Sequence, residues 1–73
     1  MIRIKLKQLL DDKAFREGRR ITLNEVSAKT GIARATINRI ASKAGYNTTT
    51  DNIEALCRYL DCTPCDLIEL VGD

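Results

Sequence analysis

Apolar residues recur at helical spacing along most of this chain, with interruptions at glycines and at turns rich in Ser and Thr. The amino terminus is different, because Ile2, Ile4 and Leu6 alternate with charged residues. A period of two predicts a short extended strand there. Beyond Leu6 the spacing becomes helical, and we expect a first helix from about Lys5 to Glu17 that ends at Gly18.

The centre of the chain carries the most informative pattern, which is two short amphipathic helices joined by a glycine. Thr22 can cap the first of these helices, and Glu25, three residues later, can complete a capping box. Gly31 follows the last turn, where the backbone needs a residue that accepts a positive φ. A second helix is expected at about residues 33–43. Its buried face is made of apolar residues at helical spacing, namely Ile32, Ile37, Ile40 and Ala41.

The opposite face of this second helix is polar or small. The residues that point away from the apolar stripe are Ala35, Asn38, Arg39 and Ser42, with Arg34 beside them at the amino-terminal end. An ordinary helical hairpin with a solvated face shows the same periodicity. The capping box, the glycine turn and the small Ser27, where two helices must approach closely, favour instead a helix-turn-helix that places its second helix in the major groove of DNA.

Two further helices are expected in the carboxyl-terminal part. Thr49 or Thr50 can cap a fourth helix, and an inward stripe follows at Ile53, Leu56, Cys57 and Leu60. A final short helix would begin at Thr63 and Pro64, with Asp66 in its first turn. Its buried side would consist of Leu67, Ile68 and Leu70. The pattern therefore predicts an all-α domain of five helices over residues 1–73, with a short N-terminal strand.

Residues 22–40 resemble the Cro and lambda-repressor-like (XRE) family, whose pattern reads T-Q-x-x-L-A-x-x-x-G-I-S-x-x-T-I-S-x-I. The chain fits that pattern at Thr22, Val26, Ser27, Gly31, Ile32, Thr36, Ile37 and Ile40. It departs from it at Leu23, where the family has a Gln that typically touches phosphate, and at Ala33, where the family has Ser. The resemblance implies a five-helix lambda-repressor-like fold and a transcriptional regulator, a repressor, that binds double-stranded DNA through a helix-turn-helix at residues 22–43.

Side-chain chemistry on the second helix gives the candidate base contacts. Arg34 can bond a guanine edge in bidentate fashion, Asn38 can bond an adenine, and Ala35 can pack on a thymine methyl group. The full set of expected base-contacting residues is Arg34, Ala35, Thr36, Asn38 and Arg39. The expected phosphate contacts are Arg19, Arg20, Thr22, Lys29, Lys43, Tyr46 and Asn47. The resemblance implies the role of the last three, and Tyr46 has the alternative of packing against the core. Arg19 and Arg20 have the alternative of a solvated loop.

Charge is distributed unevenly along the chain. Residues 1–45 hold eleven Lys or Arg and four Asp or Glu, a net charge of +7, whereas residues 46–73 hold one and six, a net charge of −5. A basic half that contains the recognition helix is typical of a polyanion-binding face, although a solvated surface can be equally uneven. The rival hypothesis is a protein-interaction module, such as an antitoxin-like partner, that binds another protein through the acidic carboxyl-terminal half.

The small size of the chain bears on its assembly and location. A unit of 73 residues offers few base contacts, so we expect a homodimer on a two-fold site with half-sites about 34 Å apart. The alternating segment of residues 2–6 could pair across that dimer or dock within its own chain. No stretch is long enough to span a membrane, and the charged amino terminus is not a secretory signal, which predicts a cytoplasmic protein.

Catalytic and metal chemistry are poorly supported. The chain has no His, so a Ser–His or Cys–His pair cannot be built, and we expect neither an enzyme nor a cofactor. Cys57, Cys62 and Cys65 have a C-x4-C-x2-C spacing that suits a metal or redox sensor, but a zinc site would need a fourth ligand from Asp61, Asp66 or another subunit. A Cys62–Cys65 disulfide is chemically possible, although a reducing cytoplasm argues against its persistence. We therefore expect no bound metal.

Overall fold

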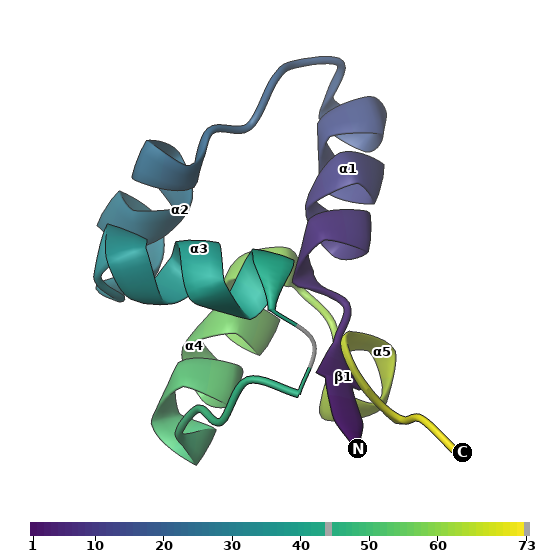
Figure 1. The fold of residues 1–73 in the computed structure, drawn as a ribbon. Coiled ribbons are helices and arrows are strands. Elements are labelled where there is room, and N and C mark those ends of the chain that lie inside the picture. The colour runs from purple at the N-terminus through teal and green to yellow at the C-terminus, as the bar shows by residue number, and fades with distance from the viewer. Residues whose placement is uncertain (44, 73) are drawn as a thin grey trace.

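The computed structural model describes residues 1–43 and 45–72. Five helices and two strands lie in this part of the chain, in an envelope of 36 × 23 × 19 Å. In chain order they are β1 (Ile2–Ile4), α1 (Leu6–Glu17), α2 (Leu23–Thr30), α3 (Arg34–Ser42), α4 (Thr50–Leu60), α5 (Pro64–Leu67) and β2 (Ile68–Leu70). Helices α2 and α3 lie against each other on one side, α1 stands on the other, and α5 with the strands lies beside both termini (Figure 1). The all-α prediction with five helices and an N-terminal strand is confirmed.

The predicted N-terminal strand pairs with a second strand that the sequence pattern did not predict. β1 runs antiparallel to β2, with Ile2 opposite Leu70 and Ile4 opposite Ile68. The N–H of Lys5 extends this pairing by donating to the carbonyl of Leu67 at 2.7 Å. Two alternatives were open for residues 2–6, pairing across a dimer or docking within the chain. The structure has the second.

The expectation that the final helix buries Ile68 and Leu70 is wrong. Helix α5 ends at Leu67 after a single turn, and the chain becomes extended at Ile68, with φ −116° and ψ 151°. Backbone groups that a longer helix would have paired internally are paired with β1 instead. As a consequence Leu67 is fully buried, Ile68 is half-buried and the side chain of Leu70 is 78% exposed.

The core collects the apolar stripes of all five helices. Its buried members are Leu6, Leu10, Val26, Ile32, Ile37, Ile40, Leu56, Cys57, Leu60 and Leu67. The predicted buried face of the second central helix is confirmed for Ile32, Ile37 and Ile40, and Ala41 packs against the same cluster. Within residues 1–43 and 45–72, no helix is both long and apolar enough to cross a bilayer.

The predicted capping box at the start of α2 is only half formed. Thr22 Oγ1 accepts a hydrogen bond from the N–H of Glu25 at 3.2 Å, as expected for an N-cap residue. The reciprocal half is wrong, because the Glu25 carboxylate is occupied by Arg19 and Tyr59 rather than by the N–H of Thr22. At the other predicted caps, Thr49 accepts from the N–H of Asn52 at 3.1 Å, and the Thr63 N–H donates to Asp66.

Candidate nucleic-acid interface

The turn between α2 and α3 is held by backbone and hydroxyl hydrogen bonds. Gly31 has φ 76°, and its N–H donates to the carbonyl of Ser27 at 2.9 Å. Ser27 Oγ donates to the carbonyl of Ile32 at 2.6 Å, so this residue ties the turn to α2 as well as letting the helices approach. Thr30 Oγ1 donates to the carbonyl of Val26 at 2.7 Å and accepts from the N–H of Ile32 at 3.3 Å. These bonds fix the direction in which α3 leaves the turn.

Helix α3 has one apolar and one exposed face, as the sequence pattern predicts. Its bounds, residues 34–42, fall one residue inside the predicted range at each end. Ile37 and Ile40 are 0% and 2% exposed on the inner side. The candidate base-contacting residues on the outer side are exposed, except for the half-buried Thr36; they are Arg34, Ala35, Asn38 and Arg39.

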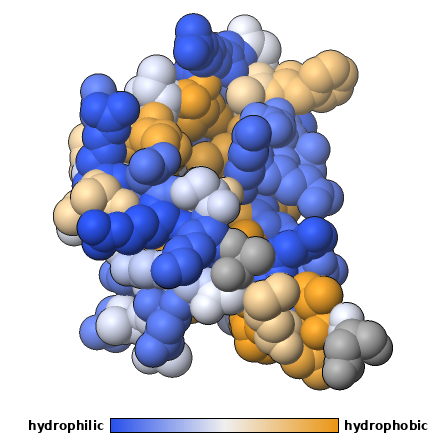
Figure 2. All heavy atoms as spheres, viewed as in Figure 1, coloured by the Kyte–Doolittle hydropathy of each residue, from blue (hydrophilic) through white to orange (hydrophobic). Residues whose placement is uncertain are grey.

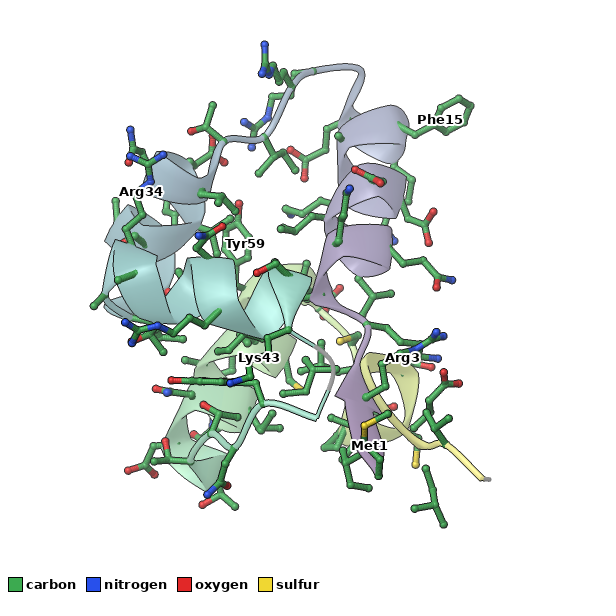
Figure 3. The ribbon with its side chains drawn as sticks, in the orientation of Figure 1. Met1, Arg3, Phe15, Arg34, Lys43 and Tyr59 are labelled. Atoms are coloured by element: carbon green, nitrogen blue, oxygen red, sulfur yellow. The ribbon has the colours of Figure 1, made fainter. Side chains whose placement is uncertain are left out.

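The two ends of α3 carry cations. Arg34 lies in the first turn, and Lys43 follows the last turn as the C-cap residue (Figure 3). In the space-filling view, hydrophilic side chains cover most of the surface on this side of the molecule (Figure 2). The N-cap residue is Ala33, which makes no side-chain cap bond, so the first N–H groups of α3 have no side-chain partner at the cap. A cationic, donor-rich face of this kind suits a polyanion.

Most of the candidate phosphate contacts are exposed, and they lie before α2, in α2 and after α3. Arg20, Lys29, Lys43 and Asn47 are exposed, and Thr22 is exposed while its hydroxyl caps α2. Tyr46 is half-buried and packs against the core, which is the alternative that its sequence position left open. Its backbone N–H donates to the carbonyl of Lys43 at 3.3 Å, which ties Tyr46 to the residue that ends α3.

Arg19 differs from the other candidate cations, because its guanidinium is held by carboxylates of the same chain. Nη1 and Nη2 donate to the two oxygens of Glu25 at 2.7 and 2.8 Å, and Nε donates to Glu17 at 2.8 Å. This bidentate hydrogen bonding by Arg19 holds the pKa of Glu25 at about 2, against the opposing effect of desolvation. The geometry therefore favours a structural role for Arg19 over a phosphate contact.

Tyr59 completes this ionic cluster from α4. Its hydroxyl donates to Glu25 Oε2 at 3.1 Å, and Lys13 Nζ lies 5.1 Å from the centre of its ring. Lys13 also pairs with Glu17 at 2.7 Å. The cluster joins α1, the loop after it, α2 and α4, and thus holds the first helix of the helix-turn-helix to α1 and α4. Sequence reasoning missed it, because Tyr59 lies 34 residues from Glu25 along the chain.

The three cysteines lie outside the helix-turn-helix, in α4, in the turn after it and in α5. Cys57 is buried, Cys62 is half-buried and Cys65 is exposed. Among the residues that the structure describes, no three His, Cys, Asp or Glu side chains are grouped so that they could hold a metal ion. The three cysteines therefore do not come together as one set of metal ligands.

Comparison with known protein families agrees with the helix-turn-helix geometry. A family model described as a Cro/C1-type HTH DNA-binding domain matches residues 5–73. The match begins one residue before α1 and includes the complete α2–Gly31–α3 unit. No curated protein matches the chain.

Proposed function

Since the chain belongs to the Cro/C1-type family of helix-turn-helix DNA-binding domains and is accordingly a DNA-binding transcriptional regulator, we propose that it is a non-catalytic repressor that recognises a specific operator with α3. The observation that carries this proposal is the two-faced construction of α3. Ile37 and Ile40 anchor its inner side in the core, while Arg34, Asn38 and Arg39 are exposed on its outer side. A helix of this build can enter the major groove without disturbing the core that holds it.

Base recognition is assigned to the outer side of α3. Arg34 offers two parallel donors to the O6 and N7 of guanine, and Asn38 offers a donor and an acceptor to adenine. Ala35 supplies a methyl contact for thymine, and Arg39 and Thr36 complete the set. Thr36 is half-buried, so only part of its side chain is open to a base.

Phosphate contacts set the position of the helix on the duplex. We assign them to exposed cations on the loop before α2, at the end of α2 and at the end of α3, which are Arg20, Lys29 and Lys43. Asn47 and the hydroxyl of Thr22 add neutral contacts, and Arg19 is left out because carboxylates occupy it. Occupancy of an operator excludes another protein from the same DNA, so repression needs no further surface.

We further propose that the working form is a homodimer on a two-fold site. Met1, Ile2 and Leu70 are 62%, 46% and 78% exposed, and Ile2 lies opposite Leu70 across the two strands. These residues form an apolar patch beside the termini, which is seen at the lower right of the space-filling view (Figure 2). Contact between two copies of one apolar patch is self-complementary, as a two-fold axis requires.

Salt dependence of DNA binding tests the proposed function. A duplex selected from a random pool is titrated with the protein by fluorescence anisotropy at several salt concentrations. Contacts from Arg20, Lys29 and Lys43 predict a plot of log affinity against log salt with a slope of about −3 per protomer. Lys43→Ala is expected to reduce that slope by about 1, whereas Arg58→Ala, which removes the same charge from α4, leaves it unchanged.

The same experiment separates the proposal from its rival. A protein that acts by docking a partner through its acidic half would select no duplex from the pool, or would bind every duplex weakly. A selected duplex whose affinity does not change with salt would also contradict the phosphate contacts.

A further inference from the structure

The last turn of α4 brings two cysteines together. Asp61, which follows the helix, has a left-handed backbone with φ 54° and ψ 52°, and its N–H donates to the carbonyl of Cys57. The N–H of Cys62 reaches the same carbonyl at 3.0 Å. A bond from the residue beyond the left-handed position to the carbonyl five residues earlier defines a Schellman-type ending, in which the first and last side chains meet. In this chain both of those side chains are thiols.

The backbone bond limits how far apart the two cysteines can be. The path from one Cα to the other runs through the Cys57 carbonyl, the 3.0 Å hydrogen bond and the N–Cα bond of Cys62. With standard bond lengths this path cannot exceed about 7 Å, and any bend shortens it. Disulfides form at Cα separations of about 4.4–6.8 Å. The two side chains also interact, since a contact with Cys57 contributes to the raised pKa of Cys62.

The surroundings of the pair admit a small reagent. Cys57 and Cys62 both line a hollow of about 620 Å³ that is walled by Ile53, Pro64 and Ile68. Cys62 is half-buried and Cys57 is 8% exposed, so Cys62 is the thiol that an incoming molecule meets first. Burial and then the neighbouring Cys57, Asp66 and Asp61 raise the pKa of Cys62 to about 11. This environment penalises a thiolate but not a neutral disulfide, which makes the forward reaction slow without disfavouring its product.

We propose that Cys57 and Cys62 are an oxidation site that forms an intramolecular disulfide by exchange with a low-molecular-weight disulfide such as oxidised glutathione. Cys62 loses its proton to solvent, and its sulfur attacks one sulfur of oxidised glutathione, whose S–S bond breaks and releases one glutathione thiolate. Cys57 then loses its proton to solvent, and its sulfur attacks Cys62 in the mixed disulfide and displaces the second glutathione as a thiolate, and both released thiolates take up protons from solvent. The protein loses two hydrogen atoms, and oxidised glutathione gains them as two thiols.

Peptide mapping of the full chain tests this pairing. The reduced protein is incubated with oxidised glutathione, free thiols are alkylated, and the product is digested with trypsin. Cleavage after Arg58 places Cys57 on peptide 44–58, whereas Cys62 and Cys65 share peptide 59–73. The proposed disulfide therefore links two peptides and leaves Cys65 alkylated or carrying a single glutathione. It should also raise the melting temperature by about 5 °C, because it closes a short loop in the unfolded chain.

Two variants fix the identity of the partner. Cys65→Ser is expected to give the linked peptides at the rate of the unaltered protein, and Cys62→Ser is expected to give almost none. Linked peptides that form equally well in Cys62→Ser would assign the partner to Cys65 and overturn the proposal. A disulfide confined to peptide 59–73, or glutathione left on each thiol with no linked peptides, would overturn it as well.

Discussion

The guanidinium of Arg19 meets the carboxylate of Glu25 in two parallel hydrogen bonds of 2.7 and 2.8 Å. The first residue lies in the loop after α1, and the second lies in the first turn of α2. A bidentate pair of this type fixes both planes and is stronger than a single ionic contact. It therefore determines how the loop enters the helix-turn-helix, and it removes one Arg from the cations that could contact DNA.

Loss of this pair should affect folding and leave DNA contacts intact. Arg19→Ala is expected to lower the melting temperature by a few degrees, because Glu25 and Glu17 both lose their guanidinium partner. The salt slope of DNA binding should not change, in contrast to Lys43→Ala. A reduced slope with an unchanged melting temperature would show that Arg19 contacts phosphate after all.

The same pair makes stability depend on acid. The pKa of Glu25 is lowered from 4.5 to about 2 in the folded protein, so its contribution to stability is fully present above pH 4.5 and is lost as the pH falls to 2. Glu25→Gln should thus lower the melting temperature at pH 6 and make progressively less difference between pH 4.5 and pH 2. Melting curves of both proteins over this range measure the effect, and a difference that is constant with pH would contradict it.

Arg34 is expected to determine one base pair of the operator. Arg34→Ala should weaken binding to the preferred duplex by about 1–3 kcal/mol and reduce discrimination at a single position. Titration of duplexes that carry every single-base change measures this, with Arg58→Ala as the control of equal charge. Uniform weakening across all the duplexes would indicate a phosphate contact instead.

Gly31 is expected to be required because of its backbone conformation, and not because a side chain would lack room there. An added Cβ would meet nothing within 4 Å, but φ is +76°, where a side chain is strained. Gly31→Ala should cost about 1 kcal/mol of folding free energy, and the β-branched Gly31→Val about 2 kcal/mol or more. Gly72→Ala, at a glycine with equal space, is the control and should leave denaturant unfolding unchanged. Equal stability of all three variants would contradict the turn assignment.

Dimer formation is expected to depend on the apolar patch at the termini. Leu70→Glu places a charge where the proposal puts a second copy, and it should convert the dimer to monomer in sedimentation at micromolar concentration. Because Leu70 is 78% exposed, the monomer should remain folded and melt cooperatively. Phe15→Glu changes an apolar residue on α1 that is 89% exposed and is the matched control. Dissociation caused by Phe15→Glu alone would move the interface to α1.

Local rules explain which parts of this structure could be predicted from sequence. The buried positions of α3 follow from spacing within nine residues, and Thr22 and Gly31 mark the ends of α2 by their own backbone preferences. The strand β2 could not be found in this way, because Ile68–Leu70 becomes extended only by pairing with residues at the other end of the chain. The Arg19–Glu25–Tyr59 cluster has the same cause, since no local pattern indicates that Tyr59 faces α2.

Antiparallel pairing of β1 with β2 also sets the order in which folding can finish. The N–H of Val71 donates to the carbonyl of Met1 at 2.8 Å, so residues that are 70 positions apart in the sequence are neighbours (Figure 1). During synthesis β1 leaves the ribosome first and waits for a partner that is translated after every helix. The two-stranded ladder therefore cannot close before every helix has been translated, and a nascent chain arrested before Ile68 leaves β1 without this partner.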